Sequence, residues 1–308
     1  MKRNKILITG GTGFIGYHLA KKCSDLNWSV DSISTKLPKK NRKVKKVKYL
    51  IFDISKKKEI EKNLSPNYDY VVNLAGYVDH SNKNKTLKSH FNGCKNIANF
   101  FLNSKVKKFV QIGSCIEYGK IKSPQKENQK KFPQTFSIYG EAKQQSTKFL
   151  LELHKKFNFP STILRLYLVY GPNQDLNRII PITIINAIKN RKFDCSSGNQ
   201  LRDFIYVDDV IKAIIKALKN KNTSGEIINI GSGKPTTIKK TIISICKLAG
   251  GGNPQFGKID FRKDEILELY PNISKAKKFL KWKPKVSLYR GIVKTISYFK
   301  RFLWKKYI

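Results

Sequence analysis

The sequence is short of the residues on which disulfide-bonded and metal-binding proteins depend. Among its 308 residues there are five cysteines, and no two of them form a Cys-x-x-Cys pair. An odd number without such pairs argues against a disulfide framework or a zinc site, and it favours a reducing, cytoplasmic setting. The four histidines lack metal-ligand spacing, so we expect no metal site.

Long apolar runs are also missing, and no stretch reaches the length that a membrane-spanning helix requires. The apolar run after the basic residues 1–5 is too short for a signal peptide. The pattern of residues 287–308 predicts a basic amphipathic helix with several aromatic side chains. Such a helix packs on its own domain more often than it lies on a membrane surface, so we expect no membrane contact.

Acidic residues are scarce. Lys and Arg total 62 against 21 Asp and Glu, which gives a net charge of +41. A positive field of this size should attract anionic ligands such as nucleotides, and salt should weaken the attraction. The basic residues are spread along the whole chain instead of forming one tail, which argues against nucleic acid as a partner.

Glycine, in contrast, is abundant in one stretch near the N-terminus. Residues Ile6–Gly16 read Ile-Leu-Ile-Thr-Gly-Gly-Thr-Gly-Phe-Ile-Gly, which predicts a strand, a tight turn and the start of a helix. Gly10 permits the turn, Gly13 permits close approach of a ligand, and Gly16 lets the helix pack on the strand. Backbone N–H groups at such a helix start can bind a pyrophosphate. A structural turn without a ligand is the alternative.

Apolar runs and amphipathic windows alternate along the chain, which predicts an α/β fold with a Rossmann-like, doubly wound parallel sheet. We divide the chain into a dinucleotide-binding domain of residues 1–172 and 206–232, and a smaller, discontinuous substrate-binding lobe of residues 173–205 and 233–308. The predicted strands are Ile6–Ile8, Ser29–Ser34, Tyr49–Phe52, Tyr70–Leu74, Phe109–Ile112, Ser161–Val169 and Glu226–Ile230.

Three polar side chains form a candidate catalytic group. If Tyr139–Leu153 is a helix, Tyr139 and Lys143 lie one turn apart on the same face. The ammonium should lower the pKa of the phenol and make it a general acid/base. An ordinary surface pair is the alternative. Ser114 follows the predicted strand Phe109–Ile112, where its hydroxyl can bind a substrate oxygen or cap a turn.

With these residues in place, the chain resembles the extended short-chain dehydrogenase/reductases, or NAD-dependent epimerase/dehydratases, of nucleotide sugars. The resemblance covers essentially the whole chain and implies a nucleotide-sugar substrate and a homodimer. It depends on ordered motifs, which begin with Thr9-Gly-Gly-Thr-Gly-Phe-Ile-Gly16, Asp53-Ile54 and Asn73-Leu-Ala-Gly76, continue with Ser114 and Tyr139-x-x-x-Lys143, and end with Arg202-Asp-Phe-Ile-Tyr-Val-Asp-Asp-Val210 and Asn272–Pro284.

The resemblance implies hydride transfer at the sugar C4 carbon. In such an enzyme Tyr139 is the acid/base, Lys143 lowers its pKa and holds the nicotinamide ribose, and Ser114 hydrogen-bonds the reacting oxygen. Arg202 and Arg262 would hold the diphosphate, with a salt bridge as the alternative for either. Cys115 would also line the substrate site. The remaining implied cofactor residues are Gly10, Gly13, Phe14, Ile15, Gly16, Asp53, Ile54, Ala75 and Gly76.

Departures from the family pattern narrow the set of reactions that we expect this chain to catalyse. The 4,6-dehydratases of this family carry Asp-Glu after the hydroxyl residue, where this chain has Cys115 and Ile116, and Glu117 comes one place too late. Many 4-epimerases carry Asn at the position that matches Leu168. A Cys115 nucleophile is conceivable, but no histidine is placed to activate it. These departures disfavour a dehydratase and weaken the epimerase interpretation.

The end of the second strand bears on the cofactor. NAD enzymes usually carry an acidic residue there for the ribose 2′-hydroxyl. Here the position is Ser34, and the nearby Lys36 suits the 2′-phosphate of NADP, so we favour NADP over NAD. Asp31 is the rival if the strand ends three residues earlier.

A preference for NADP favours net reduction. The leading hypothesis is a 4-ketosugar reductase of deoxysugar or polysaccharide synthesis, similar to CDP-abequose and paratose synthases. A UDP-glucose 4-epimerase-type enzyme with tightly bound NAD is the runner-up. A non-catalytic nucleotide- or RNA-binding member of the fold is the distant alternative.

Overall fold

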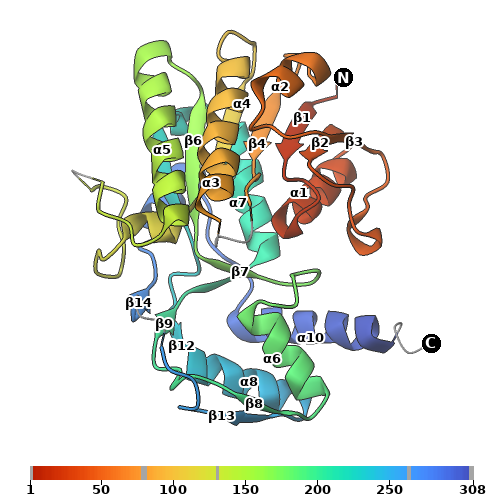
Figure 1. Cartoon of the computed structure of the whole chain (residues 1–308), viewed down its shortest axis with the longest axis vertical. Helices are drawn as coiled ribbons and strands as arrows, with labels where there is room; N and C mark the ends of the chain where they lie inside the picture. Colours follow the sequence, from red (N-terminus) through yellow and green to blue (C-terminus); the bar gives the residue numbers. More distant parts are fainter. Residues whose placement is uncertain (1–2, 78–81, 130–131, 262–264, 305–308) are drawn as a thin grey trace.

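A computed structural model describes residues 3–77, 82–129, 132–261 and 265–304. Within these ranges seven parallel strands form one sheet, in the order β11-β6-β5-β4-β1-β2-β3. The strand order reverses at β1, which confirms the predicted doubly wound sheet (Figure 1). The strands are β1 (Lys5–Thr9), β2 (Ser29–Ser34), β3 (Val47–Ile51), β4 (Tyr70–Asn73), β5 (Lys108–Ser114), β6 (Ser161–Leu166) and β11 (Glu226–Ile230).

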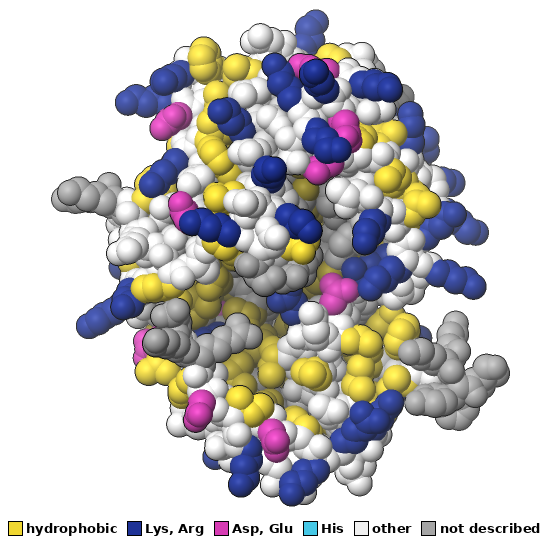
Figure 2. Space-filling model, in the orientation of Figure 1, with side chains coloured by type: hydrophobic (Ala, Val, Ile, Leu, Met, Phe, Trp, Pro, Cys, Tyr) yellow, Lys and Arg dark blue, Asp and Glu magenta, His cyan; other side chains and the backbone are white. Residues whose placement is uncertain are grey.

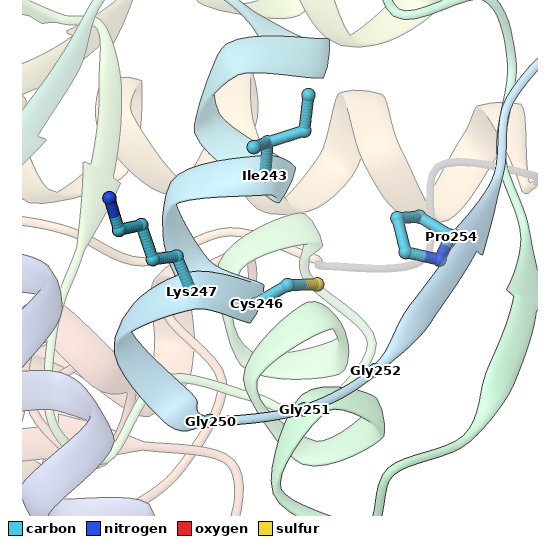
Figure 3. A pocket seen from close by; sticks show the side chains of 7 residues that line it. All are labelled: Ile243, Cys246, Lys247, Gly250, Gly251, Gly252 and Pro254. Atoms are coloured by element: carbon cyan, nitrogen blue, oxygen red, sulfur yellow. The ribbon is translucent and has the colours of Figure 1, made fainter.

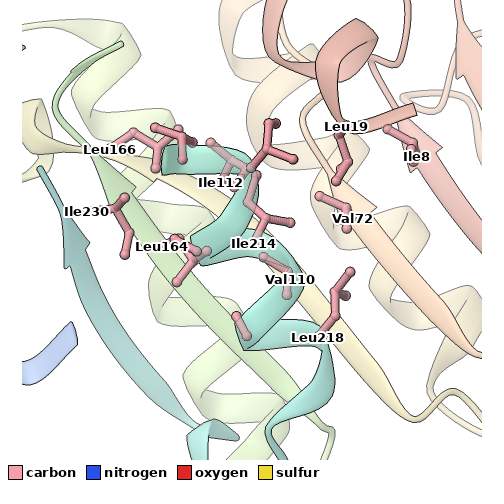
Figure 4. Close-up of a cluster of buried hydrophobic side chains, with 14 of the residues drawn as sticks. Ile8, Leu19, Val72, Val110, Ile112, Leu164, Leu166, Ile214, Leu218 and Ile230 are labelled. Atoms are coloured by element: carbon pink, nitrogen blue, oxygen red, sulfur yellow. The ribbon is translucent and has the colours of Figure 1, made fainter. Parts of the chain in front are cut away.

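Both faces of the sheet are buried, as expected for parallel strands. Successive side chains alternate between the faces, so Ile6 and Ile8 enter one core and Leu7 enters the other. The first core lies under α1 (Phe14–Asp25), α7 (Val207–Lys219) and α9 (Ser274–Leu280), and Figure 4 shows its strand and α7 side chains meeting. The second core lies under α2 (Lys57–Asn63), α4 (Gly93–Phe101) and α5 (Ile138–Phe157).

A third core lies beyond the carboxyl edge of the sheet, in the lower part of Figure 1. It is formed by α6 (Ile179–Ile188), α8 (Ile238–Ala249) and α10 (Leu288–Trp304). Ile292, Ile296 and Phe299 of α10 are buried there, which confirms that this helix packs on its own chain. No helix in the described ranges is long and apolar enough to cross a membrane.

Short strands connect the third core to the sheet. The predicted strand Ser161–Val169 is in fact two strands, because its second half leaves the main sheet to pair elsewhere. The short pairings are β7 (Leu168–Tyr170) with β10 (Phe204–Tyr206), β9 (Leu201–Arg202) with β12 (Thr236–Thr237) and β14 (Glu268–Leu269), and β8 (Lys192–Asp194) with β13 (Asn253–Gln255).

Two buried aspartates of the Arg202–Val210 motif tie distant segments to the fold. The Asp203 carboxylate accepts hydrogen bonds from the backbone N–H groups of residues 232 and 233, at 2.6 and 2.7 Å. The Asp209 carboxylate accepts from those of residues 285 and 286, at 2.8 and 2.7 Å. These carboxylates fix the segments that lead into α8 and α10, so their role in the motif is structural.

A polar junction also joins the segment after β2 to the third core. The buried Arg42 side chain donates to the Asn173 carbonyl at 3.1 Å and to the Asp175 carboxylate at 2.9 Å. The Tyr298 hydroxyl of α10 donates to the Asn173 side chain at 2.7 Å. The basic segment after β2 is therefore anchored at one point of its length.

Candidate active site

The glycine stretch forms a tight turn between β1 and α1. Gly10 has a φ of +71°, and a Cβ there would lie 2.8 Å from the Leu74 carbonyl carbon, so only glycine fits. A Cβ at Gly16 would lie 2.3 Å from the Gly10 carbonyl oxygen. Gly16 therefore packs the helix against the turn itself.

The start of α1 has the features of an anion-binding helix end. Gly13 occupies the N-cap without a side-chain cap, and the first turn, with Phe14 and Ile15, contains no acidic residue. A Cβ at Gly13 would meet only the Gly10 carbonyl oxygen, at 3.2 Å. The residues present therefore fit a dinucleotide pyrophosphate laid across this turn.

The end of β2 lies beside the same turn. Ser34 is its last residue, and the Ser34 hydroxyl accepts a long hydrogen bond of 3.4 Å from the Thr12 N–H. Asp31 is buried, and its carboxylate accepts the Tyr68 hydroxyl at 2.6 Å. Asp31, the alternative residue for the cofactor ribose, is thus buried and hydrogen-bonded within the core. Lys36 is exposed just past the strand.

Four further predicted cofactor residues follow β3 and β4 at the carboxyl edge of the sheet. Asp53 accepts the Ser55 N–H at 2.9 Å, and Ile54 is buried in the second core. Ala75 and Gly76 follow β4, and a Cβ at Gly76 would lie 1.8 Å from the His90 ring. The structure brings these residues to the edge that carries the glycine turn.

Ser114, Tyr139 and Lys143 converge at the end of β5. Ser114 is the last residue of that strand and is hydrogen-bonded to Tyr139. Its hydroxyl also accepts the Ile116 N–H at 3.4 Å. Ser114 therefore both caps the turn after β5 and lies next to Tyr139. The Lys143 ammonium donates to the Ile112 carbonyl at 2.7 Å and lies 5.9 Å from the centre of the Tyr139 ring.

The expected pKa shift of Tyr139 is wrong in sign. Burial raises the pKa of Tyr139 to about 12, and the hydrogen bond from Ser114 offsets only part of that rise. Burial also lowers the pKa of Lys143 to about 8, against the opposing charge of Glu117. Desolvation is the largest influence on both groups, and the Lys143 ammonium donates its hydrogen bond to the Ile112 backbone carbonyl.

Two of the predicted substrate residues, Cys115 and Arg202, lie near Ser114. Cys115 is buried in a small cluster with Tyr167 and Leu269, against which Leu168 packs. Arg202 is buried and forms an ion pair with Glu265. The salt-bridge alternative therefore holds for Arg202 in this structure, while Arg262 lies outside the described residues.

Three residues near Tyr139 were missed as site residues. The His90 ring contacts the Tyr139 ring edge-on, with centres 5.0 Å apart. It lies in η2 (Lys88–Asn92), a π-helix whose irregular turn leaves no periodic signal in a sequence. The charge of Arg178, before α6, also acts on Tyr139. The sequence pattern excludes Glu117 as a dehydratase acid, because it comes one place too late, and its spacing of three residues from Ser114 is the signal that points to another role.

A separate surface pocket of about 490 Å³ lies at the C-terminal end of α8 (Figure 3). Its lining lies apart from the predicted site residues. Those lining residues are Ile243, Cys246, Lys247, Gly250, Gly251, Gly252 and Pro254.

The protein belongs to the NAD dependent epimerase/dehydratase family, which matches residues 6–231. A relative from Methanocaldococcus jannaschii, named "Putative UDP-glucose 4-epimerase", is 32% identical over 96% of this chain and 98% of its own. The CDP-abequose synthase of Salmonella muenchen is 27% identical over 95% of this chain and 97% of its own. The chain is therefore an extended short-chain dehydrogenase/reductase.

Solved structures of family members have the same fold. The UDP-glucose 4-epimerase of Thermotoga maritima, determined with UDP-glucose, has a TM-score of 0.89 at 26% identity, over 97% of this chain and 99% of that one. A UDP-glucuronic acid 4-epimerase variant from Bacillus cereus, determined with NAD and a fluorinated nucleotide sugar, has a TM-score of 0.87 at 26% identity and the same coverage.

Proposed function

We propose that the protein is an oxidoreductase that transfers a hydride between a nicotinamide cofactor and C4 of a nucleotide sugar, and that it works as a 4-ketosugar reductase. The observation that carries the proposal is the convergence of Ser114, Tyr139 and Lys143 at the carboxyl edge of the sheet, the edge that also carries the glycine turn. Membership of the family and the nucleotide-sugar enzymes among its relatives support the substrate class.

Each of the three side chains has one task in the reduction. A bound dihydronicotinamide supplies the hydride to the carbonyl carbon. Tyr139 donates its phenolic proton to the carbonyl oxygen, and Ser114 donates a hydrogen bond to the same oxygen. The Lys143 ammonium stabilises the phenolate that Tyr139 becomes.

The protonation state of Tyr139 and the residues at the end of β2 both suit a reductase. Burial keeps the pKa of Tyr139 near 12, so the phenol is protonated at neutral pH. A reductase needs this protonated form, whereas oxidation of a sugar hydroxyl needs the phenolate. Ser34 and Lys36 at the end of β2 suit the phosphate of NADP, and exchangeable NADPH suits a reductase.

The neighbours of Ser114 support exclusion of a dehydratase. Cys115 and Leu168 belong to an apolar cluster, and a buried thiol cannot replace a carboxylate in the elimination of water. Burial raises the pKa of Cys115 to about 12, so the thiol stays neutral.

We further propose that the third core and its strands form the substrate lobe, with residues 173–205 and 233–308 except α9, which packs on the first core of the main sheet. The diphosphate of the substrate would take the place of Glu265 beside Arg202. By the family resemblance, we also propose a homodimer.

Two incubations test the activity. With NADPH and a 4-keto nucleotide sugar, a reductase consumes NADPH in proportion to product. With UDP-glucose or UDP-galactose and no added cofactor, an epimerase interconverts the two sugars. The likeness to UDP-glucose 4-epimerases favours this second candidate. Interconversion without NADPH consumption would exclude the reductase, and tenfold tighter binding of NADH than NADPH would exclude the NADP preference.

A further inference from the structure

The carboxylate of Glu117 is fully buried immediately behind the catalytic group. It lies in η3 (Cys115–Tyr118), the short turn that follows β5. A buried carboxylate is costly unless it is paired and hydrogen-bonded. Glu117 satisfies that condition by binding three different elements, so its contacts show what it holds together.

The first contact is with Ser114. The Ser114 N–H donates to the Glu117 carboxylate at 2.8 Å, while the Ser114 hydroxyl accepts a backbone N–H of η3. This reciprocal arrangement is a capping box. It fixes the backbone of Ser114 and hence the direction of its hydroxyl at the end of β5.

The second and third contacts are with α5 and β6. The Thr147 hydroxyl of α5 donates to the Glu117 carboxylate at 2.7 Å, one turn after Lys143. From β6, the Arg165 guanidinium donates through Nε at 3.0 Å and places Nη2 at 2.9 Å. Gln144 of α5 also donates to the Glu117 backbone carbonyl at 3.3 Å.

We propose that Glu117 is a positioning residue of the active site, which clamps the end of β5 to α5 so that Ser114 stays against Tyr139 and Lys143. The inference rests on the proposed function, because it assigns those three side chains to the reaction. It also explains why a carboxylate follows the hydroxyl residue at this place without acting as a dehydratase acid.

The buried charge also acts on Lys143. The Glu117 carboxylate and the Cys94 thiol act electrostatically on the ammonium, which also lies 5.9 Å from the Tyr139 ring centre, and Glu117 in turn acts on Arg165 and Tyr139. The negative charge of Glu117 raises the pKa of Lys143 and thereby opposes the effect of burial. Removing that charge should therefore lower the pKa of Lys143 further.

The test uses Glu117→Gln and the double variant Glu117→Gln/Arg165→Met in the full chain. The double variant removes both charges, which avoids leaving a buried guanidinium unpaired if the single variant fails to fold. We expect kcat to fall by about tenfold to a hundredfold with little change in KM. The alkaline limb of the pH profile should move to lower pH, which a purely structural defect would not do.

Tyr118→Phe is the matched control. It removes a hydroxyl of the same turn that donates to Asn229 at 2.8 Å and also contacts Arg165, while the Glu117 carboxylate and the groups that donate to it all remain. We expect its kcat and its alkaline limb to match the wild type. Glu117→Asp should keep the alkaline limb of the pH profile at its wild-type position, because the negative charge of the carboxylate remains.

A second readout needs no substrate. Hydrogen exchange of the Ser114 amide should be at least about tenfold faster in the double variant and unchanged in Tyr118→Phe. The inference would be overturned if a folded double variant kept the wild-type kcat and the wild-type alkaline limb of the pH profile. It would also be overturned if the hydrogen-exchange rate of the Ser114 amide were unchanged in that variant. An active Tyr139→Phe would instead overturn the proposed function, so the two failures are distinguishable.

Discussion

At the scale of single residues, burial and charge compete over one turn of α5. The phenol of Tyr139 and the ammonium of Lys143 share a helix face, as their spacing predicts, and yet burial raises the pKa of Tyr139 and lowers the pKa of Lys143. Both shifts disfavour the charged form. The pair therefore presents a proton donor at neutral pH.

Replacing Tyr139 by Phe removes that proton donor while leaving the ring. We expect turnover in Tyr139→Phe to fall by about 10²- to 10⁴-fold with cofactor affinity retained, since general acid catalysis contributes on that order. Steady-state kinetics and cofactor titration measure both. Tyr170→Phe, in the third core, is the control. Retained turnover in Tyr139→Phe would remove the catalytic assignment.

Lys143 should set the alkaline limit of the reaction. Its pKa of about 8 means that the ammonium is present below that pH and is lost as the pH rises through it. The ammonium stabilises the developing phenolate, so kcat/KM for reduction should decline above about pH 8. A pH–rate profile measures this. A flat profile between pH 7 and about 10 would contradict the role of Lys143.

At the scale of elements, the turn between β1 and α1 contains two glycines with different expected roles, one in folding and one in binding. Gly16 has a neighbour in the way of any Cβ, whereas Gly13 has an ordinary φ of −73° and only one close neighbour. Replacing Gly13 by alanine therefore tests dinucleotide binding, whereas replacing Gly16 by alanine tests the stability of the fold.

Gly13→Ala should fold normally and bind the dinucleotide at least about tenfold more weakly, because its methyl group would occupy the place of the pyrophosphate. Gly16→Ala should lower the melting temperature, because its Cβ meets the Gly10 carbonyl. Thermal melts and cofactor titrations distinguish them. Unaltered dinucleotide affinity in Gly13→Ala would argue against a pyrophosphate on this turn.

Asp209 provides a second test at this scale. Its buried carboxylate accepts two backbone N–H groups before α10. Asp209→Asn should lower the free energy of unfolding by about 2 kcal/mol, since charge-assisted hydrogen bonds are lost. Asp208→Asn, at a half-buried neighbouring position, should cost less. Equal losses in the two variants under urea denaturation would contradict the structural role of Asp209.

At the scale of the whole molecule, charge is spread without a single basic tract. Figure 2 shows Lys and Arg over the whole visible face, with few acidic groups and a hollow at mid-height lined by hydrophobic side chains. Such a field raises the local concentration of anionic substrates. It acts on encounter, not on the chemical step.

The reaction should therefore depend on salt through kcat/KM. With a net charge of +41, we expect kcat/KM for a nucleotide sugar to fall several-fold between low salt and about 0.5 M salt, while kcat changes little. Kinetics at a series of salt concentrations measure this. An equal fall in kcat would indicate damage to the protein instead of screening.

The sheet and the shared helix face of Tyr139 and Lys143 were predictable because their signals are local. The apolar runs around Ile6 and Val71 and the one-turn spacing of Tyr139 and Lys143 need no tertiary knowledge. The pKa of Tyr139 was not predictable, because desolvation depends on what covers the phenol. The contact of His90 and the pairing of Arg202 with Glu265 join residues far apart in the chain, so spacing could not reveal them.

Transfer of isotope from cofactor to sugar tests the central claim most directly. The enzyme would be incubated with NADPH that carries deuterium at both C4 positions of the nicotinamide and with a 4-keto nucleotide sugar, and the product examined by NMR and mass spectrometry. The account predicts one deuterium at sugar C4 with wild-type enzyme, and a greatly slowed transfer with Tyr139→Phe. Product without deuterium at C4, or equal transfer by the two proteins, would contradict it.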